Sequence, residues 1–413
     1  MMGGNYKMQT LKNSIHYVAA SKDEEILKNS SSGGIFSEIA YCIFKMNGVV
    51  FGATFDSNEY KIVHTMVSCM EELSKIRKSK YVESDFKRVE PDIERNIDKN
   101  RYILFSGTPC QVEYIKRKYG YYDKLVTVDV FCHGVAESVY FKDYLKSLSS
   151  EILEIDFRTQ SKERHNYEFD IIGKEKKKIE HCDYCENIFT KLYIDSAVLR
   201  NSCFKCMLSQ KQHISDITLG DFDFQEDAEK RGINVLHPSI VAINTERGEK
   251  IFDSIREKIS YDILNDLEKI KFYYRDHKKI KGEWGYNIEC KEKFIQELQK
   301  MDFLNAAYKC GFPDIYDLLI QLEQKMGESK KYLIYGAGVI AHRFEKAAKQ
   351  LHPEWELQGN IVSDIKNKLK NSVVISVDEI SLGCSYPIVV AVNATNRKQI
   401  VSELTKRGIY NYI

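Results

Sequence analysis

The sequence predicts an α/β and α+β protein made of a mixed-sheet domain, a helical connector and a small C-terminal Rossmann-like domain. A strand, loop and helix pattern occurs twice between Arg101 and Leu148, which favours an α/β layout with a partly parallel sheet. A fresh strand, turn and helix pattern begins at Lys331. The 413 residues also exceed the ~100 to 200 residues of a typical single domain. We therefore predict domains over residues 1–262, 263–328 and 329–413.

The first predicted helix follows Ser30, where Ile35, Ile39 and Ile43 recur at a helical spacing. Asn47 and Gly48 end this pattern. Strands are then expected at 49–55 and 61–67.

The clearest unit begins with a short apolar strand at 102–105. Thr108 is expected to cap the next helix, with Pro109 at its first position and Gly120 at its end. The apolar stretch 125–131 predicts a second buried strand, which is followed by a loop and by a helix at 136–148.

The remaining chain is assigned more coarsely. The middle is predicted to contain strands at 152–158, 167–172, 216–221 and 239–244. Residues 264–325 are predicted to be mainly helical. The last domain is predicted to contain strands at 331–335, up to Ser363, at 389–393 and at 409–413, with helices after the glycine turn to Gln350 and at 395–406.

Charge and hydropathy exclude several classes of function. The net charge of +1 provides no overall field to attract nucleic acid or an anionic membrane. No stretch reaches the ~18 apolar residues of a spanning helix, and the first ten residues lack the apolar core of a signal peptide. We therefore expect a cytoplasmic protein with no membrane span and no nucleic-acid partner; the sequence leaves an oligomer open.

The eleven cysteines allow two metal sites. Cys182 and Cys185, with Cys203 and Cys206, have the paired spacing of a four-cysteine zinc ribbon. Cys110 and Cys132 each follow a predicted strand, and the same Cys203–Cys206 pair would complete a site for an iron-sulfur cluster. Cys110 also lies in the first turn of a predicted helix, where the backbone dipole favours thiolate. Spacing alone leaves both sites open, and Cys110 and Cys132 also fit as ordinary buried side chains.

Seven sequence blocks resemble the coenzyme F420 hydrogenase/dehydrogenase beta subunit family. They are SSSGGIFSEIA, GVVFGATF, KSKYVESD, ILFSGTPCQV, VDVFCHGV, LRNSCFKC and SDITLGDFD, and they span about Val18 to Ile255 in the order of that family. The resemblance implies a flavin- and iron-sulfur-dependent reductase containing FAD and a 4Fe-4S cluster. By the same resemblance, the cluster ligands are Cys110, Cys132, Cys203 and Cys206, whereas Cys182 and Cys185 match no block.

The resemblance also implies the kind of electron donor and the biosynthetic pathway. Many bacterial members begin with a ferredoxin-like segment of eight cysteines, but only Cys42 and Cys69 precede Cys110 here. Electrons are therefore expected from ferredoxin or another electron-donor protein, or from a reduced deazaflavin or nicotinamide, and they would pass to a small-molecule substrate. Many relatives are encoded beside surface-polysaccharide genes, which implies a role in polysaccharide biosynthesis. No catalytic residue is predicted, since His133 fits a structural hydrogen bond as well as a proton donor.

FAD requires N–H donors for its diphosphate and a flat, mostly apolar slot for its ring. The predicted FAD contacts fall into three groups: serines and glycines at a helix start, a lysine-tyrosine pair, and positions where the backbone permits close approach of the cofactor. They are Ser31, Ser32, Gly33, Gly34, Gly52, Lys80, Tyr81, Ser106, Gly107 and Thr108.

The last domain contains the pattern G-x-G-x-x-A between a strand and a helix. Gly336 and Gly338 provide the turn, and Asp364 at the end of the next strand is placed to bind a ribose hydroxyl. The domain resembles short Rossmann-like modules of bacterial sugar-modifying and capsule enzymes, which implies a nucleotide sugar or a nicotinamide nucleotide. A purely structural glycine turn remains the alternative. A zinc-stabilised nucleotide-sugar-binding or assembly protein without redox activity is the alternative function.

Overall fold

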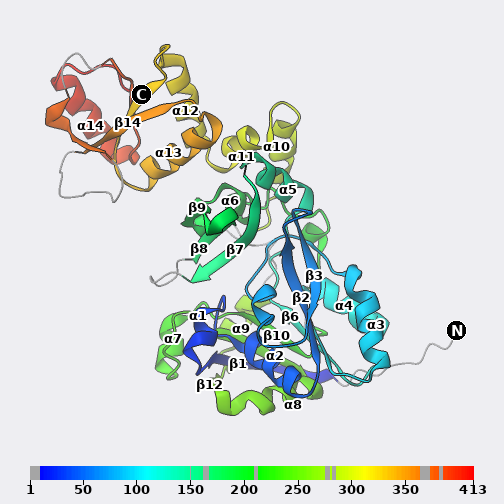
Figure 1. The fold of residues 1–413 in the computed structure, drawn as a ribbon. Coiled ribbons are helices and arrows are strands. Elements are labelled where there is room, and N and C mark those ends of the chain that lie inside the picture. The colour runs from blue at the N-terminus through cyan, green and yellow to red at the C-terminus, as the bar shows by residue number, and fades with distance from the viewer. Residues whose placement is uncertain are drawn as a thin grey trace. The chain divides into compact units, whose positions relative to one another are not determined.

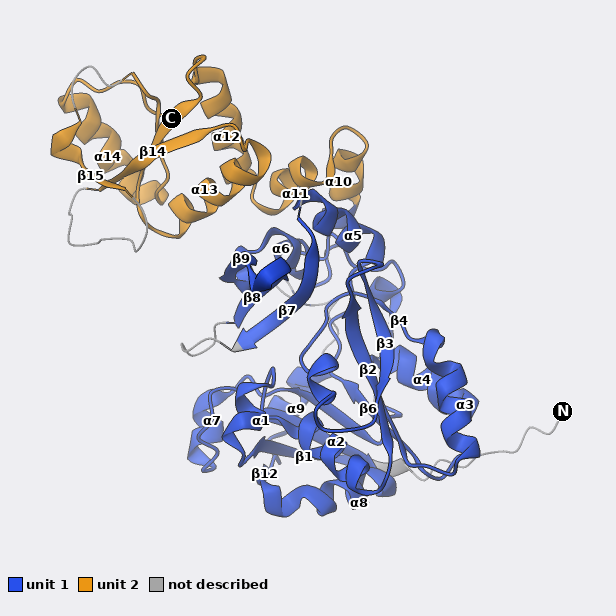
Figure 2. Ribbon diagram, in the orientation of Figure 1, with its two compact units in different colours: residues 1–291 blue, residues 292–413 orange. Residues whose placement is uncertain are grey.

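The computed structural model describes residues 10–148, 150–160, 167–208, 213–274, 280, 285–362, 373–380 and 385–413. The chain forms two compact units, Met1–Lys291 and Glu292–Ile413 (Figure 2). Both units combine helices with sheets, so the predicted α/β and α+β class is confirmed. No helix among the described residues combines the length and the hydropathy that a membrane-spanning segment requires.

A nine-stranded mixed sheet organises the first unit (Figure 1). The strand order is β12-β1-β11-β10-β6-β5-β2-β3-β4. The bounds are β1 Thr10–Ser21, β2 Val49–Asp56, β3 Lys61–Val67, β4 Ser84–Asp85, β5 Ile103–Ser106, β6 Leu125–Val130, β10 Ile217–Asp221, β11 Ser239–Thr245 and β12 Ile259–Ile263. The four neighbours β2, β5, β6 and β10 run parallel, as the repeated strand and helix pattern predicts.

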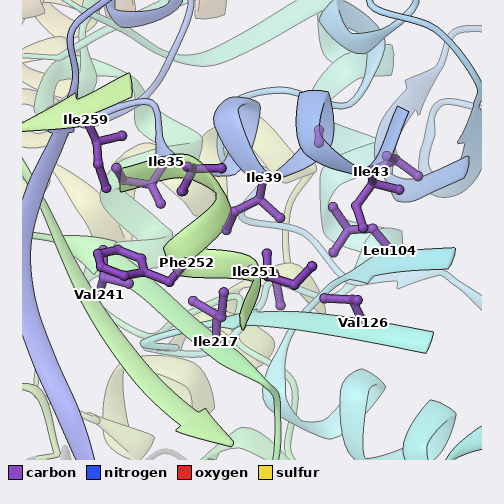
Figure 3. Close-up of a cluster of buried hydrophobic side chains, with 14 of the residues drawn as sticks. Ile35, Ile39, Ile43, Leu104, Val126, Ile217, Val241, Ile251, Phe252 and Ile259 are labelled. Carbon is purple, nitrogen blue, oxygen red and sulfur yellow. The ribbon is translucent and has the colours of Figure 1, made fainter. Parts of the chain in front are cut away.

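Alternate side chains of the central strands belong to two separate cores, because successive residues of a strand point to opposite faces. Val50, Leu104 and Val126 belong to one core, which includes α2 (Ile35–Lys45) and α8 (Glu246–Ile255), and part of which is shown in Figure 3. The residues between them, such as Val49 and Ile103, pack with α3 (Glu90–Asp98) and α4 (Pro109–Tyr119). Helices therefore cover both faces of the parallel strands.

We expect Ile39→Ala to destabilise the first unit by about 2–5 kcal/mol, the usual cost of truncating a buried isoleucine. Ile39 is fully buried in α2 and belongs to the core in Figure 3. Urea unfolding followed by far-ultraviolet circular dichroism measures the change. Lys45→Ala, at an exposed position of the same helix, is the matched control. Equal unfolding midpoints for the two variants would contradict the assigned core.

A smaller antiparallel sheet lies in the same unit. Its order is β7-β8-β9, with β7 Ile152–Gln160, β8 Tyr167–Gly173 and β9 Lys178–Asp183. Its aromatic side chains pack with those of α5 (Ser138–Ser147) and α6 (Ile188–Ile194), as in the contact of Phe157 with Phe141 at 5.5 Å between ring centroids. The other α-helices of this unit are α1 Glu24–Lys28, α7 Gln225–Lys230 and α9 Leu267–Tyr273.

The second unit contains a four-stranded parallel sheet of order β15-β14-β13-β16. Its bounds are β13 Lys331–Tyr335, α13 Val339–Leu351, β14 Glu356–Val362, β15 Val374–Ser376, β16 Ile388–Val390 and α14 Ala394–Lys406. Three helices come before this sheet in the chain: α10 Ile288–Leu298, within which the unit boundary falls, α11 Phe303–Gly311 and α12 Pro313–Lys325.

Two predicted strands of the second unit are corrected. The strand at 389–393 ends at Val390, because Asn393 caps α14 by accepting from the backbone N–H of Asn396 at 2.9 Å. The strand predicted at 409–413 is reduced to an isolated bridge between Tyr412 and Ile388, and backbone hydrogen bonds join Asn411 and Ile413 to β16.

Candidate functional site

A cavity of 760 Å³ lies at the carboxyl ends of three parallel strands in the first unit. It is bordered by Ser106 at the end of β5, Val130 at the end of β6 and Asp221 at the end of β10. Ligands of α/β sheets bind at this edge. The volume falls within the ~300–1,000 Å³ of typical small-molecule sites.

The serine-glycine segment before α2 forms one wall. Ser31, Ser32 and Gly34 line the cavity. Gly34 adopts φ = 76°, and a side chain there would meet Ile26 at 2.7 Å, so this position requires glycine. Gly33 is not among the lining residues: its N–H donates to Ser239 Oγ at 3.0 Å, and a Cβ would lie 2.5 Å from the carbonyl oxygen of Ala19. Gly33 therefore allows close backbone packing behind the wall.

The segment containing Lys80 and Tyr81 is tied to this wall. The backbone N–H of Ser79 donates to Ser31 Oγ at 3.0 Å, and both Lys80 and Tyr81 line the cavity. The Lys80 ammonium donates to the carbonyl oxygens of Arg77 and Lys78. Burial lowers the pKa of Lys80 to about 7; repulsion from Lys78 adds to this, while Asp156 opposes it. An anion entering the cavity would be a stronger partner for this ammonium than neutral carbonyls.

Tyr81 contributes an aromatic surface. Its ring lies 5.0 Å from that of Tyr193 and 5.5 Å from that of Tyr184, measured between centroids. Burial raises the pKa of the Tyr81 phenol, so the group is neutral at physiological pH. All three tyrosines line the cavity, which gives it a largely uncharged aromatic side.

The predicted turn from Ser106 to Thr108 lines the cavity in full. Its backbone is fixed, because Gly107 N–H donates to the carbonyl of Val128 at 3.1 Å and Thr108 N–H donates to Gln111 Oε1 at 2.9 Å. Thr108 caps α4 as predicted. Gly52 is not a lining residue; a Cβ there would lie 3.0 Å from Ile76.

Two of the four predicted cluster cysteines, Cys132 and Cys203, have pKa values raised by burial and by neighbouring cysteines. Burial raises the pKa of Cys132 well above its ordinary value, and Cys203, Cys110 and Cys206 raise it further, while the N–H of Gly134 opposes the shift. Burial likewise raises the pKa of Cys203, with Cys110 and Cys206 adding to the shift.

The loop after β6 supports this arrangement. Gly134 has φ = 131°, and a Cβ there would lie 3.4 Å from the Cβ of Cys203. The sulfur of Cys203 accepts from the N–H of Val135. Cys132 lines the cavity, so one predicted ligand belongs both to the cavity wall and to the thiol group. His133 also lines the cavity, with its ring 5.6 Å from that of Tyr193.

The two cysteines that belong only to the predicted zinc ribbon have different surroundings. The thiol of Cys182 is buried and donates to Glu180 at 3.6 Å, while Cys185 is exposed and lines the cavity. Among the described residues, no group of three or more His, Cys, Asp or Glu side chains is arranged to hold a single metal ion. This finding applies to the cysteines of the zinc alternative and to the four predicted cluster cysteines alike.

Several lining residues escape prediction from the sequence. Arg158 on β7 is buried, donates to Asp221 Oδ2 at 2.6 Å and holds its guanidinium carbon 3.5 Å from the ring centroid of Tyr167. His64 on β3 is buried, and burial lowers its pKa to about 4. Neither residue belongs to a sequence motif. For Arg158, the only indication in the sequence is a charged residue within a stretch that otherwise predicts a strand.

The predicted C-terminal glycines lie in the second unit. Gly336 and Gly338 form the turn between β13 and α13, as predicted. Asp364 lies outside the described residues.

Two family models match the chain. One describes the N-terminal part of the coenzyme F420 hydrogenase/dehydrogenase beta subunit, and it matches residues 16–89. The other describes the C-terminal part of the same beta subunit, and it matches residues 100–268. Together these ranges make up more than half of the chain and contain all the residues that line the cavity except Phe272 and Tyr273.

Comparison with individual proteins finds similar chains among solved structures. No curated protein matches the chain. The chain is similar to a chain in a structure that reports xenon derivatization of the F420-reducing NiFe hydrogenase complex from Methanosarcina barkeri. The two share 15% sequence identity with a TM-score of 0.44, over 72% of this chain and 96% of that chain.

Proposed function

Because the chain belongs to the coenzyme F420 hydrogenase/dehydrogenase beta subunit family, and is thus a redox subunit of the hydrogenase/dehydrogenase type, we propose that it is an oxidoreductase using FAD and a 4Fe-4S cluster. It passes electrons between a donor and a small-molecule substrate. The donor is ferredoxin, a reduced deazaflavin or a reduced nicotinamide, and the pathway is that of a surface polysaccharide.

The position of Cys132 carries this proposal. Cys132 lines the cavity, and its pKa is raised by burial and by the neighbouring Cys203, Cys110 and Cys206. A cofactor in the cavity and a cluster on these thiols would therefore share one wall, which suits electron transfer between them. A zinc site with a purely structural role requires no such shared wall.

The lining residues fit FAD. Ser31, Ser32 and the backbone at Gly34 would supply donors to the diphosphate, with the Lys80 ammonium adding charge. Tyr81 and Tyr193 provide an aromatic side for the ring and exclude water there. FAD, when bound, accepts or donates a hydride and exchanges electrons with an iron-sulfur cluster.

The affinity for FAD is expected to fall as pH rises above about 7. The Lys80 pKa of about 7 in the empty cavity means that the ammonium loses its proton above that pH. A diphosphate binds the protonated form better, so binding takes up a proton and its affinity decreases by up to about tenfold per pH unit until the pKa of the bound state is reached. Titration of the apoprotein with FAD by fluorescence quenching, from pH 6 to 9, measures this slope. Constant affinity across the range would remove Lys80 from the diphosphate site.

Purification without oxygen tests the function as a whole. The protein is expected to be coloured, with one FAD and about four iron and four sulfide per chain. Metal analysis, acid-labile sulfide analysis and the visible spectrum measure these contents. A colourless protein with stoichiometric zinc and no flavin would overturn the proposal in favour of the zinc-stabilised alternative.

A further inference from the structure

The parallel sheet of the second unit has a topological switch point. The chain passes from β13 through α13 to β14 and β15 on one side of β13, and it then returns to place β16 on the other side. The carboxyl ends of β13 and β16 are therefore neighbours, and α13 and α14 begin shortly after these ends. Ligands of open parallel sheets bind in the crevice formed at such a point.

The two glycines of the first turn have different roles. Gly336 has φ = 131°, and a Cβ there would lie 2.8 Å from the carbonyl oxygen of Ala391, so it lets the two turns pack together. Gly338 needs no such space, since a Cβ there would meet nothing within 4 Å among the described residues. It caps α13 in an extended conformation that any residue can adopt. Glycine at this position thus leaves the backbone open to close approach from outside.

The electrostatics of the crevice favour an anion. Both α13 and α14 have thirteen residues, and neither carries an acidic side chain in its first turn. Their dipoles add positive potential at the same edge of the sheet; Asn393 caps one N–H of α14, whereas no side chain of the described residues caps α13. Arg397 lies just after the first turn of α14 and donates to the carbonyl of Val390, at the end of β16, at 2.8 Å. A cation near a helix N-terminus is unfavourable by itself, and a bound anion would offset that cost.

A buried acceptor points to a second part of the ligand. Asn360 on β14 is 1% exposed, and its side-chain amide donates to the carbonyl of Gly336 at 3.1 Å, which directs the side chain at the glycine turn. Its Oδ1 atom is buried and has no hydrogen-bond partner in the part of the chain that the structure describes. An unsatisfied buried acceptor is costly, and a hydroxyl group that reached the turn would satisfy it.

We propose that the crevice formed by the 336–338 turn and the start of α14 binds a nucleoside diphosphate group. The diphosphate lies over the Gly338 backbone and near Arg397, and a ribose hydroxyl donates to Asn360 Oδ1. This site is separate from the redox cavity and lies outside the two ranges matched by the family models. A nucleotide sugar and a nicotinamide dinucleotide both contain the proposed group.

Isothermal titration calorimetry of the full-length protein, loaded with FAD, tests the site with UDP, UDP-glucose, NAD⁺ and inorganic phosphate. We expect saturable binding of UDP that inorganic phosphate alone does not reproduce. UDP-glucose binding with no response to NAD⁺ would assign a nucleotide sugar, and the reverse would assign a dinucleotide. Phosphate binding as tight as that of UDP would overturn the nucleoside part of the proposal, and no binding by any probe would overturn all of it.

Gly338→Leu fills the open approach and should weaken nucleotide binding at least about tenfold, since a side chain would occupy the path of the diphosphate. Gly327→Leu is the matched control, because a Cβ at Gly327 also meets nothing within 4 Å among the described residues. We expect wild-type binding for this control and an unchanged melting temperature for both variants. Arg397→Gln should also weaken binding. Equal affinity in wild type and Gly338→Leu would place nucleotide binding elsewhere and overturn the assignment.

Discussion

Cys132→Ser is expected to remove the iron-sulfur cluster and to lower turnover more than about 100-fold, since losing a ligand exceeds the 10- to 100-fold effects of changes around a ligand. Cys132 lies on the cavity wall. Burial raises the pKa of its thiol, and the neighbouring Cys203, Cys110 and Cys206 raise it further. Iron and sulfide analysis, with the visible spectrum, measures the loss directly. Reduction of an artificial acceptor reports the remaining flavin activity.

Cys185→Ser is the matched control for this result. Cys185 lines the same cavity but is not one of the four proposed ligands. We expect its iron, sulfide and flavin contents to equal those of the wild type. A Cys185→Ser protein that loses metal, beside a Cys132→Ser protein that keeps it, would reverse the assignment of the ligands.

Lys80→Met should weaken FAD binding by about 10- to 100-fold at pH 6, because hydrogen bonds to charged groups contribute about 1.5–3 kcal/mol. The same change should remove the pH dependence of the affinity, since the titrating ammonium is gone. Methionine keeps most of the side-chain length, so the buried stem can still pack. Equilibrium titration of the apoprotein at pH 6 and pH 9 measures both effects.

Lys75→Met serves as the control for Lys80→Met. Lys75 is exposed and pairs with Glu72, and it does not line the cavity. Its affinity and pH profile should match those of the wild type. If both variants lose affinity equally, long-range attraction rather than a local contact would explain the effect.

Local sequence rules predicted the parts of the site that depend on local backbone geometry. A capping threonine followed by proline gave the start of α4. The helix α2 begins directly after two glycines, and the left-handed backbone at position 34 favours glycine there. The parallel strands β5 and β6 followed from short apolar runs. These features depend on residues within a few positions of one another.

Features that depend on distant partners were not predicted. The strand β1 pairs with β11 and β12, which lie more than two hundred residues later, and its polar start hides the buried stretch 17–20. The contact of Arg158 with Asp221 and Tyr167 joins three separate strands. No sequence motif predicts this contact, because its three residues lie on strands of two different sheets and come together only in the folded unit.

The separation of the four cysteines along the chain has a consequence for maturation. Cys110 and Cys132 follow adjacent strands β5 and β6, whereas Cys203 and Cys206 come from a segment before β10. Under the proposed ligand set, the polypeptide must pair these strands before its four sulfurs can bind one cluster, unlike a zinc finger, which metal itself folds. The proposed cluster would then be inserted late, into an already folded chain, so cells short of iron should accumulate a stable, inactive precursor that can be filled when supply returns.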